Sequence, residues 1–165
     1  MAALAGADPL IVGGLSADAR RLEAARRLGA THTVVIETEN IDEIVRDLSP
    51  LGADVVCDAS GVSETLVVAV RLARPDGQIS KVGWSPDVIP MDPNPLVLRN
   101  VRLQGSFSHN YPIWERVIHL LDRGTTLPSE IIGLRAPLEG WRDAFDAMHE
   151  RRVIKSVILP GAELA

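Results

Sequence analysis

The sequence predicts an α/β fold built on a parallel sheet, and three observations support it. Short apolar runs alternate with helical patterns as far as about residue 107, which is typical of parallel strands joined by right-handed crossovers. The runs are rich in Val and Ile and end in small residues, as strands buried on both faces do. The 165 residues are 46% hydrophobic and 24% charged, which is enough to bury the core of one domain.

Residues 10–30 are expected to form a buried strand followed by an amphipathic helix. The strand covers residues 10–12, and Gly13 and Gly14 end it. Ser16 suits the N-cap of the helix, because its hydroxyl can accept a hydrogen bond from a free amide of the first turn. Gly29 suits the C-terminal cap, where the chain commonly takes a positive φ.

Residues 33–73 are expected to repeat this strand and helix alternation twice. The first strand covers residues 33–36, and Asn40 with Glu43 forms a capping pair for the helix that follows. The second strand covers residues 53–58 and is expected to be buried on both faces, with Cys57 an inert buried thiol inside it. Ser63 then caps a helix that reaches about residue 73, and Asp58 is expected to take part in that cap.

The order of the predicted elements changes after residue 107. Residues 75–77 form a turn in which Pro presets φ and Gly accepts a positive φ, and a strand follows over residues 78–82. A proline-rich loop leads to an alternating strand over residues 101–107. Helix, helix and strand come next, over about 114–121, 141–148 and 153–159. We therefore place a domain boundary between residues 107 and 108, which gives segments 1–107 and 108–165.

Composition narrows the classes of function. A net charge of −5 argues against a nucleic-acid-binding surface, since neutralising phosphates needs a basic field. The apolar runs are too short to span a membrane, so no membrane partner is expected. A single cysteine excludes disulfide and multi-thiolate zinc frameworks and fits a reducing, cytoplasmic compartment. The four histidines lack ligand spacing, and no catalytic or metal-ligating residue is named.

Eight short motifs occur in a fixed order, and their order and spacing are more specific than any one of them. They are Arg20–Ala30, Cys57–Gly61, Arg74–Gln78, Val82–Gly83, Gln104–Phe107, Trp114–Glu115, Pro137–Leu138 and Ile154–Lys155. Together they resemble the medium-chain dehydrogenase/reductase superfamily, and most closely its zinc-dependent alcohol, sorbitol and threonine dehydrogenase branch. The resemblance covers essentially the whole chain and implies a Rossmann-like doubly wound parallel sheet with a C-terminal segment that in relatives returns to the catalytic domain.

The sequence also departs from the family pattern at its start. Relatives carry a catalytic domain with zinc ligands first, then a strand and a G-x-G-x-x-G turn that holds the pyrophosphate. The chain is therefore expected to lack that first strand and glycine-rich turn, as a truncated product, a mis-called start or half of a split gene. Cofactor binding and activity of this chain alone should then be weakened or lost, and zinc is expected only in the missing domain. The family's central strand would be absent, so the strands at 10–12 and 53–58 should pair directly or accept a strand from another chain.

The residues at the end of the first strand do not decide whether the cofactor is NAD or NADP. A dinucleotide site usually has an acidic residue there, whereas Gly14 occupies that place. Arg20 and Arg21 nearby suit the 2′-phosphate of NADP, although they also fit a solvated helix face. Asp18 offers a carboxylate instead, which would suit NAD.

Other cofactor-binding residues are implied by the resemblance. The turn formed by Ser60, Gly61 and Val62 matches the one that lies against the ribose and nicotinamide side of the cofactor, and small residues there let the backbone approach closely. Main-chain groups that hold the carboxamide in relatives match four residues: Val82, Gly83, Ser106 and Ser108. Lys155 matches a basic position that reaches a cofactor phosphate, and it also fits an outward residue on the last strand.

The resemblance implies the nucleotide-binding portion of a dehydrogenase that transfers hydride between NAD(P) and a small alcohol or carbonyl substrate. Two alternatives stay open: a non-catalytic oligomerising or binding fragment, and a zinc-independent quinone or enoyl reductase of the same superfamily. Residues 101–107 resemble a strand that pairs with its copy, so a homodimer or higher oligomer is expected.

Overall fold

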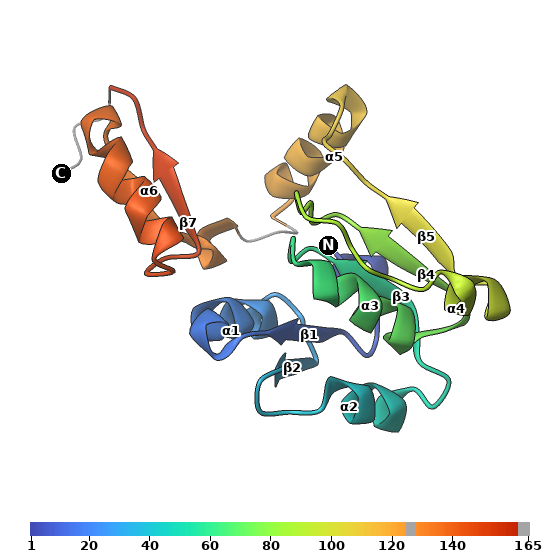
Figure 1. Ribbon diagram of the computed structural model, residues 1–165. Helices are drawn as coiled ribbons and strands as arrows, with labels where there is room; N and C mark the ends of the chain where they lie inside the picture. The colour runs from blue at the N-terminus through green and yellow to red at the C-terminus, as the bar shows by residue number, and fades with distance from the viewer. Residues whose placement is uncertain (125–127, 162–165) are drawn as a thin grey trace. The chain divides into compact units, whose positions relative to one another are not determined.

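The computed structural model describes residues 1–124 and 128–161. The chain divides into two compact units, Met1–Glu39 with Tyr111–Ala165 and Asn40–Asn110. Strand pairing in the described residues is parallel throughout, in three sheets with the orders β1-β2, β3-β4-β5 and β6-β7. The predicted α/β class with parallel strands is confirmed. Figure 1 labels the α-helices and all strands but β6. The described part contains no helix with the length and apolar content to cross a membrane.

The first unit contains the β1-β2 sheet and the β6-β7 sheet. Its strands are β1 (Ile11–Gly14), β2 (His32–Val35), β6 (Ile132–Ala136) and β7 (Lys155–Ile158). Its α-helices are α1 (Ala19–Arg27), α5 (Tyr111–Asp122) and α6 (Trp141–His149). Short 3-10 turns cover Ala3–Ala5, Ser16–Asp18, Pro128–Glu130 and Leu138–Gly140. Strand β6 is not predicted from the sequence, because Gly133 and Arg135 interrupt its apolar pattern.

The second unit is a three-stranded sheet with one long helix packed on it. Its strands are β3 (Ala53–Asp58), β4 (Ala73–Lys81) and β5 (Arg102–Gly105), and its helices are α2 (Ile41–Leu48), α3 (Ser63–Leu72) and α4 (Asn94–Leu98). Helix α3 lies along one face of the sheet (Figure 1). The core between them contains Leu66, Ala69, Val70, Ala73, Ile79 and Val101. Hydrophobic burial here positions the carboxyl ends of β3 and β4 relative to the start of α3.

The expectation that β3 is buried on both faces is wrong. Val55 is 61% exposed and Cys57 is also exposed, whereas Val56 packs against the α3 core. Side chains alternate between the two faces of a strand, and only the face toward α3 is covered. Cys57 is therefore an exposed thiol, not a buried one.

Two helix starts also differ from the sequence expectation. Ser16 begins a 3-10 turn, and α1 starts only at Ala19. Ser63 is the first residue of α3, after an N-cap at Val62 that makes no side-chain cap bond. By contrast, the Asn40 side chain accepts hydrogen bonds from the amides of Asp42 and Glu43, which confirms the predicted cap of α2.

The predicted turn at residues 75–77 lies inside β4, as a bulge between two paired stretches. Ala53 pairs with Ala73, and the register then resumes at Val55 with Gln78. Asp76 takes the positive φ of 56°, not Gly77. Gly77 is needed for space, because a Cβ there would lie 2.8 Å from the Arg74 carbonyl oxygen.

Strands β1 and β3 belong to different sheets, so their direct pairing is not found among the described residues. Insertion of a strand from another chain stays a prediction, as does the domain boundary between residues 107 and 108.

Candidate functional site

The carboxyl ends of β3 and β4 meet at a compact turn that contains five of the predicted site residues. Asp58 and Lys81 are register partners at the last paired position of the two strands. The amides of Val82 and Gly83 both donate to the Asp58 carbonyl oxygen, at 2.9 and 2.8 Å. The chain after β4 is therefore held against the turn that joins β3 to α3. Ligands of open α/β sheets bind at this kind of edge.

A buried ion pair fixes this turn. The Lys81 ammonium lies 2.7 Å from Asp58 Oδ2, and the side chains are 16% and 2% exposed. Asp58 Oδ1 accepts from the Ser60 amide, the Ser60 hydroxyl and the Thr65 hydroxyl at 3.1, 2.9 and 2.9 Å. Both carboxylate oxygens are thus satisfied, as a buried charge requires.

The predicted role of Asp58 as a partner in the helix cap is therefore only partly right. Asp58 reaches the first turn of α3 through the Thr65 hydroxyl rather than through the free amides of the helix. Burial works to raise the pKa of the Asp58 carboxyl, but the hydrogen bonds from Lys81, Ser60 and Thr65 outweigh it and hold the pKa below its usual value. Lys81 was missed in the sequence, although a lysine inside an apolar strand signals a buried partner.

Two glycines let the two backbones approach at this edge. Gly61 has a φ of 74°, and a Cβ there would lie 2.9 Å from the Trp84 carbonyl oxygen. A Cβ on Gly83 would lie 2.4 Å from the Gly61 nitrogen and 2.8 Å from the Ala59 carbonyl carbon. A side chain at either position would push the turn open. The two glycines therefore allow the segment after β4 to pack backbone to backbone against the turn after β3.

The predicted residues fall into two groups, one in each unit. Ser60, Gly61, Val62, Val82 and Gly83 come together at the turn just described, and Ser106 joins it because its amide donates to the Lys81 carbonyl oxygen at 2.9 Å. Ser108 follows with a φ of 62°. Gly14, Arg20, Arg21 and Lys155 belong to the other unit. Lys155 is an exposed residue at the start of β7.

The carboxyl end of β1 carries the second group. Asp18 forms an ion pair with Arg21, with Oδ1 2.6 Å from Nη1, and its Oδ2 accepts from the Leu15 amide at 3.3 Å. Glu37, which follows β2, accepts a hydrogen bond from the Ser16 amide. The Glu37 carboxylate was not named from the sequence, because only the parallel register of β1 and β2 brings residues 16 and 37 together.

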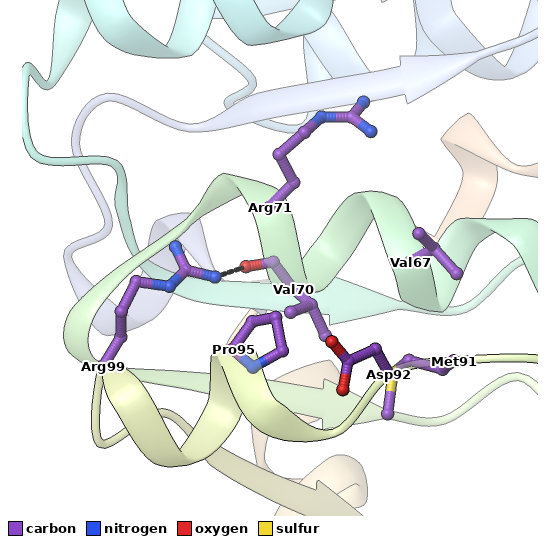
Figure 2. A pocket seen from close by; sticks show the side chains of 7 residues that line it. All are labelled: Val67, Val70, Arg71, Met91, Asp92, Pro95 and Arg99. Atoms are coloured by element: carbon purple, nitrogen blue, oxygen red, sulfur yellow. Dashed lines mark hydrogen bonds between the residues drawn. The ribbon is translucent and has the colours of Figure 1, made fainter.

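A separate hollow of about 330 Å³ lies between α3 and the segment that leads to β5 (Figure 2). Figure 2 shows Arg99 pointing to the carboxyl end of α3, where it donates to the carbonyl oxygens of Val70 and Ala73. Arg71 on the same helix is held by both oxygens of Asp42. These arginines complete the helix end and its contact with α2.

Metal-ligating side chains do not gather in either unit. Within residues 1–124 and 128–161, no group of three His, Cys, Asp or Glu side chains is placed to hold a metal ion. The residues described here therefore do not fit a zinc centre.

Comparison with known proteins identifies a family model and a curated relative, and both are dehydrogenases. Residues 1–123 match the family model described as zinc-binding dehydrogenase. A D-arabitol-phosphate dehydrogenase from Enterococcus avium is 34% identical over 151 residues, which cover 90% of this chain and 43% of that protein. The chain thus spans less than half the length of this curated relative.

Solved structures show the same fold. An alcohol dehydrogenase from Thermotoga maritima matches with a TM-score of 0.87 and 26% identity, over 96% of this chain and 45% of that one. A protein described as a zinc-binding dehydrogenase from Sinorhizobium meliloti, solved with NADP bound, matches with a TM-score of 0.78 and 31% identity, over 87% of this chain and 42% of that one.

Proposed function

The chain belongs to the zinc-binding dehydrogenase family, and we propose that its residues form the dinucleotide-binding portion of an alcohol or polyol dehydrogenase. Such an enzyme transfers hydride between NAD or NADP and a small alcohol or carbonyl substrate, with the nicotinamide ring as hydride carrier. The part played by these residues is to bind and orient the cofactor. The proposal assigns these residues no part in the choice of substrate.

The closed backbone turn at the ends of β3 and β4 carries the proposal. Gly61 and Gly83 let the two segments pack backbone to backbone where a Cβ would clash, and the Asp58–Lys81 pair keeps the turn in place. In this arrangement Ser60 to Val62 contact the ribose side of the cofactor, while Val82, Gly83, Ser106 and Ser108 hold the carboxamide through main-chain groups.

We propose further that the isolated 165 residues bind the cofactor weakly and do not turn over substrate. The sequence contains no G-x-G-x-x-G motif, whose amides and helix N-terminus would hold the pyrophosphate. The described residues also lack a metal-binding group of side chains. Binding through the remaining contacts is therefore expected to be weaker than at a site that has the glycine-rich turn.

Backbone amide NMR of the whole 165-residue chain tests the proposal, because it detects weak binding residue by residue. Titration with NADH is expected to shift the amide signals of Ser60–Val62 and of Val82–Gly83. Gly61→Ala should abolish these shifts, since its Cβ would meet the Trp84 carbonyl oxygen at 2.9 Å. The matched control is Gly105→Ala, where nothing lies within 4 Å of the added Cβ. Shifts confined to other segments, or none at all, would exclude the proposal.

A homodimer formed through β5 is also proposed. Strand β5 is an edge strand of its sheet, and its four residues are all exposed. Phe107, just beyond it, is 91% exposed, which is unusual for a large apolar side chain. Sedimentation velocity should show a dimer that Phe107→Glu dissociates, and a monomer in the unmodified chain would contradict this proposal.

A further inference from the structure

The first unit consists of two parts, and each part has buried residues of its own. In residues 1–39, α1 packs on β1 and β2, and Leu22 and Val34 are buried. In residues 128–161, which we call the C-terminal lobe, α6 packs on β6 and β7, and Ala144 is fully buried. Hydrophobic burial thus holds each part together through its own helix and its own pair of strands.

Two ion pairs connect the C-terminal lobe to residues 1–39. Arg27 Nε on α1 lies 2.5 Å from Glu130 Oε2 of the lobe. Arg151 Nε, which follows α6, lies 3.9 Å from Asp18 Oδ1 at the start of α1. Among the residues described in these two parts, no backbone hydrogen bond or strand pairing joins one part to the other. The polar contact between the parts is therefore made by charged side chains.

A hollow of about 330 Å³ lies between α1 and the lobe. Its residues from α1 are Arg20, Glu23 and Arg27, and all three are exposed. Its residues from the lobe include Ile132 and Val153, which are partly buried. Charged side chains of one part thus share the hollow with apolar side chains of the other, so this junction lacks the close apolar packing of a protein core.

The two α1 residues in these ion pairs also have partners in their own part of the chain. Arg27 Nη1 lies 3.0 Å from Glu23 Oε1, one turn earlier on α1. Asp18 Oδ1 lies 2.6 Å from Arg21 Nη1. Departure of the lobe would therefore leave both Arg27 and Asp18 in an ion pair. The penalty that normally follows the removal of one partner from a charge pair is thus avoided on the α1 side.

We propose that the C-terminal lobe releases reversibly from α1, with the pairs Arg27–Glu130 and Asp18–Arg151 as a salt-sensitive latch. On the lobe side, Glu130 and Arg151 are 27% and 43% exposed, so both charges can be solvated by water after release. Ion pairs at this exposure change an equilibrium constant by about fivefold at most. Salt at about 1 M shortens the screening length to about 3 Å, so it weakens the latch.

Backbone ¹⁵N relaxation of the whole 165-residue chain tests this inference. It compares the rotational correlation time of the amides in β6 and β7 with that of the amides in β1 and β2. The informative variant is Glu130→Gln, which keeps the size of the side chain, removes its charge and leaves Arg27 paired with Glu23. The matched control is Glu150→Gln, because Glu150 is an exposed carboxylate that pairs with Arg152 of the same lobe at 2.6 Å.

In about 0.01 M NaCl the two sheets should share one correlation time, and about 1 M NaCl should shorten that of β6 and β7 alone. Glu130→Gln should lower the ratio of docked to released lobe by up to about fivefold, whereas Glu150→Gln should leave it unchanged. The salt titration needs no variant, so it decides the inference even if Glu130→Gln does not fold.

Three results would overturn the inference. In the first, β6 and β7 tumble together with β1 and β2 at both salt concentrations, so that packing holds the lobe. In the second, the lobe of the unmodified chain tumbles independently already at low salt, so that the ion pairs do not hold it. In the third, Glu130→Gln and Glu150→Gln have the same effect on the ratio of docked to released lobe.

Discussion

Replacement of Asp58 by asparagine should destabilise the unit formed by residues 40–110 more than any surface change on the same strand. The Asp58 carboxylate accepts four hydrogen bonds, from the Lys81 ammonium, the Thr65 hydroxyl and both the amide and the hydroxyl of Ser60. An asparagine in its place would present an amide that cannot neutralise the ammonium, and Lys81 is only 16% exposed. Asp58→Asn therefore removes the ion pair between Asp58 and Lys81.

The expected loss is about 3 kcal/mol in the free energy of unfolding. Removal of one partner of a buried pair typically costs about 3–5 kcal/mol, and the residual exposure of Lys81 places this site at the lower end. For a chain of this length, that corresponds to a drop in Tm of roughly 6–12 °C. The double variant Asp58→Asn/Lys81→Met should lose less than the sum of the single variants, by about 0.5–3 kcal/mol, because the pair is coupled.

Urea unfolding followed on the amide signals of β3 and β4 measures the change in stability at this site. The control is Asp54→Asn on the same strand, whose carboxylate pairs with Arg74 but is 78% exposed. That exposed pair is worth at most about 1 kcal/mol. The argument from burial would be refuted if Asp58→Asn lowered the free energy of unfolding by less than about 0.5 kcal/mol. It would also be refuted if Asp58→Asn and Asp54→Asn lowered it equally.

Two further predictions concern pH and the end of α3. Because the pKa of Asp58 is lowered in the folded chain, its contribution to stability is full above the unfolded pKa of about 4 and disappears as pH falls through the folded pKa. The free energy of unfolding should therefore fall less steeply with decreasing pH in Asp58→Asn than in the unmodified chain. Equal slopes of this free energy against pH would contradict the prediction. Arg99→Met should cost about 1–3 kcal/mol in urea unfolding, since it removes the donors to the Val70 and Ala73 carbonyl oxygens. Arg102→Met, at an exposed residue of β5, should stay within about 0.5 kcal/mol, and a similar loss in both variants would argue against a role for Arg99 at the helix end.

Local pattern was sufficient for most of the elements. The alternation of apolar runs with helical stripes predicts β1 to β5 and the helices α1 to α3, since each run is closed by Gly, Pro or a cap that acts within a few residues. Asn40 is a clear case, because a side chain that caps its own helix needs no distant partner. The fold class and the turn at residues 60–62 could be read in the same way, from short-range chemistry and the order of motifs.

Pairings between distant residues could not be read from the sequence. The exposure of Cys57 depends on whether anything covers the far face of β3, and no local pattern states that. Strand β6 has a weak apolar pattern and is recognised only through its pairing with β7. The Ser16 cap failed because the chain takes a 3-10 turn there, in which the Ser16 amide binds Glu37 from the next strand.

The sequence by itself determined the parallel α/β class, the family resemblance and the small-residue turn where a cofactor is expected. Only the tertiary structure decided which charges stand at that turn and at the end of β1. Lys81 meets Asp58, and Glu37 meets Ser16, through the register of parallel strands whose residues are more than twenty positions apart in the chain. Register is set by how whole strands pack on their helices, so the electrostatics of the site follows from packing rather than from local sequence.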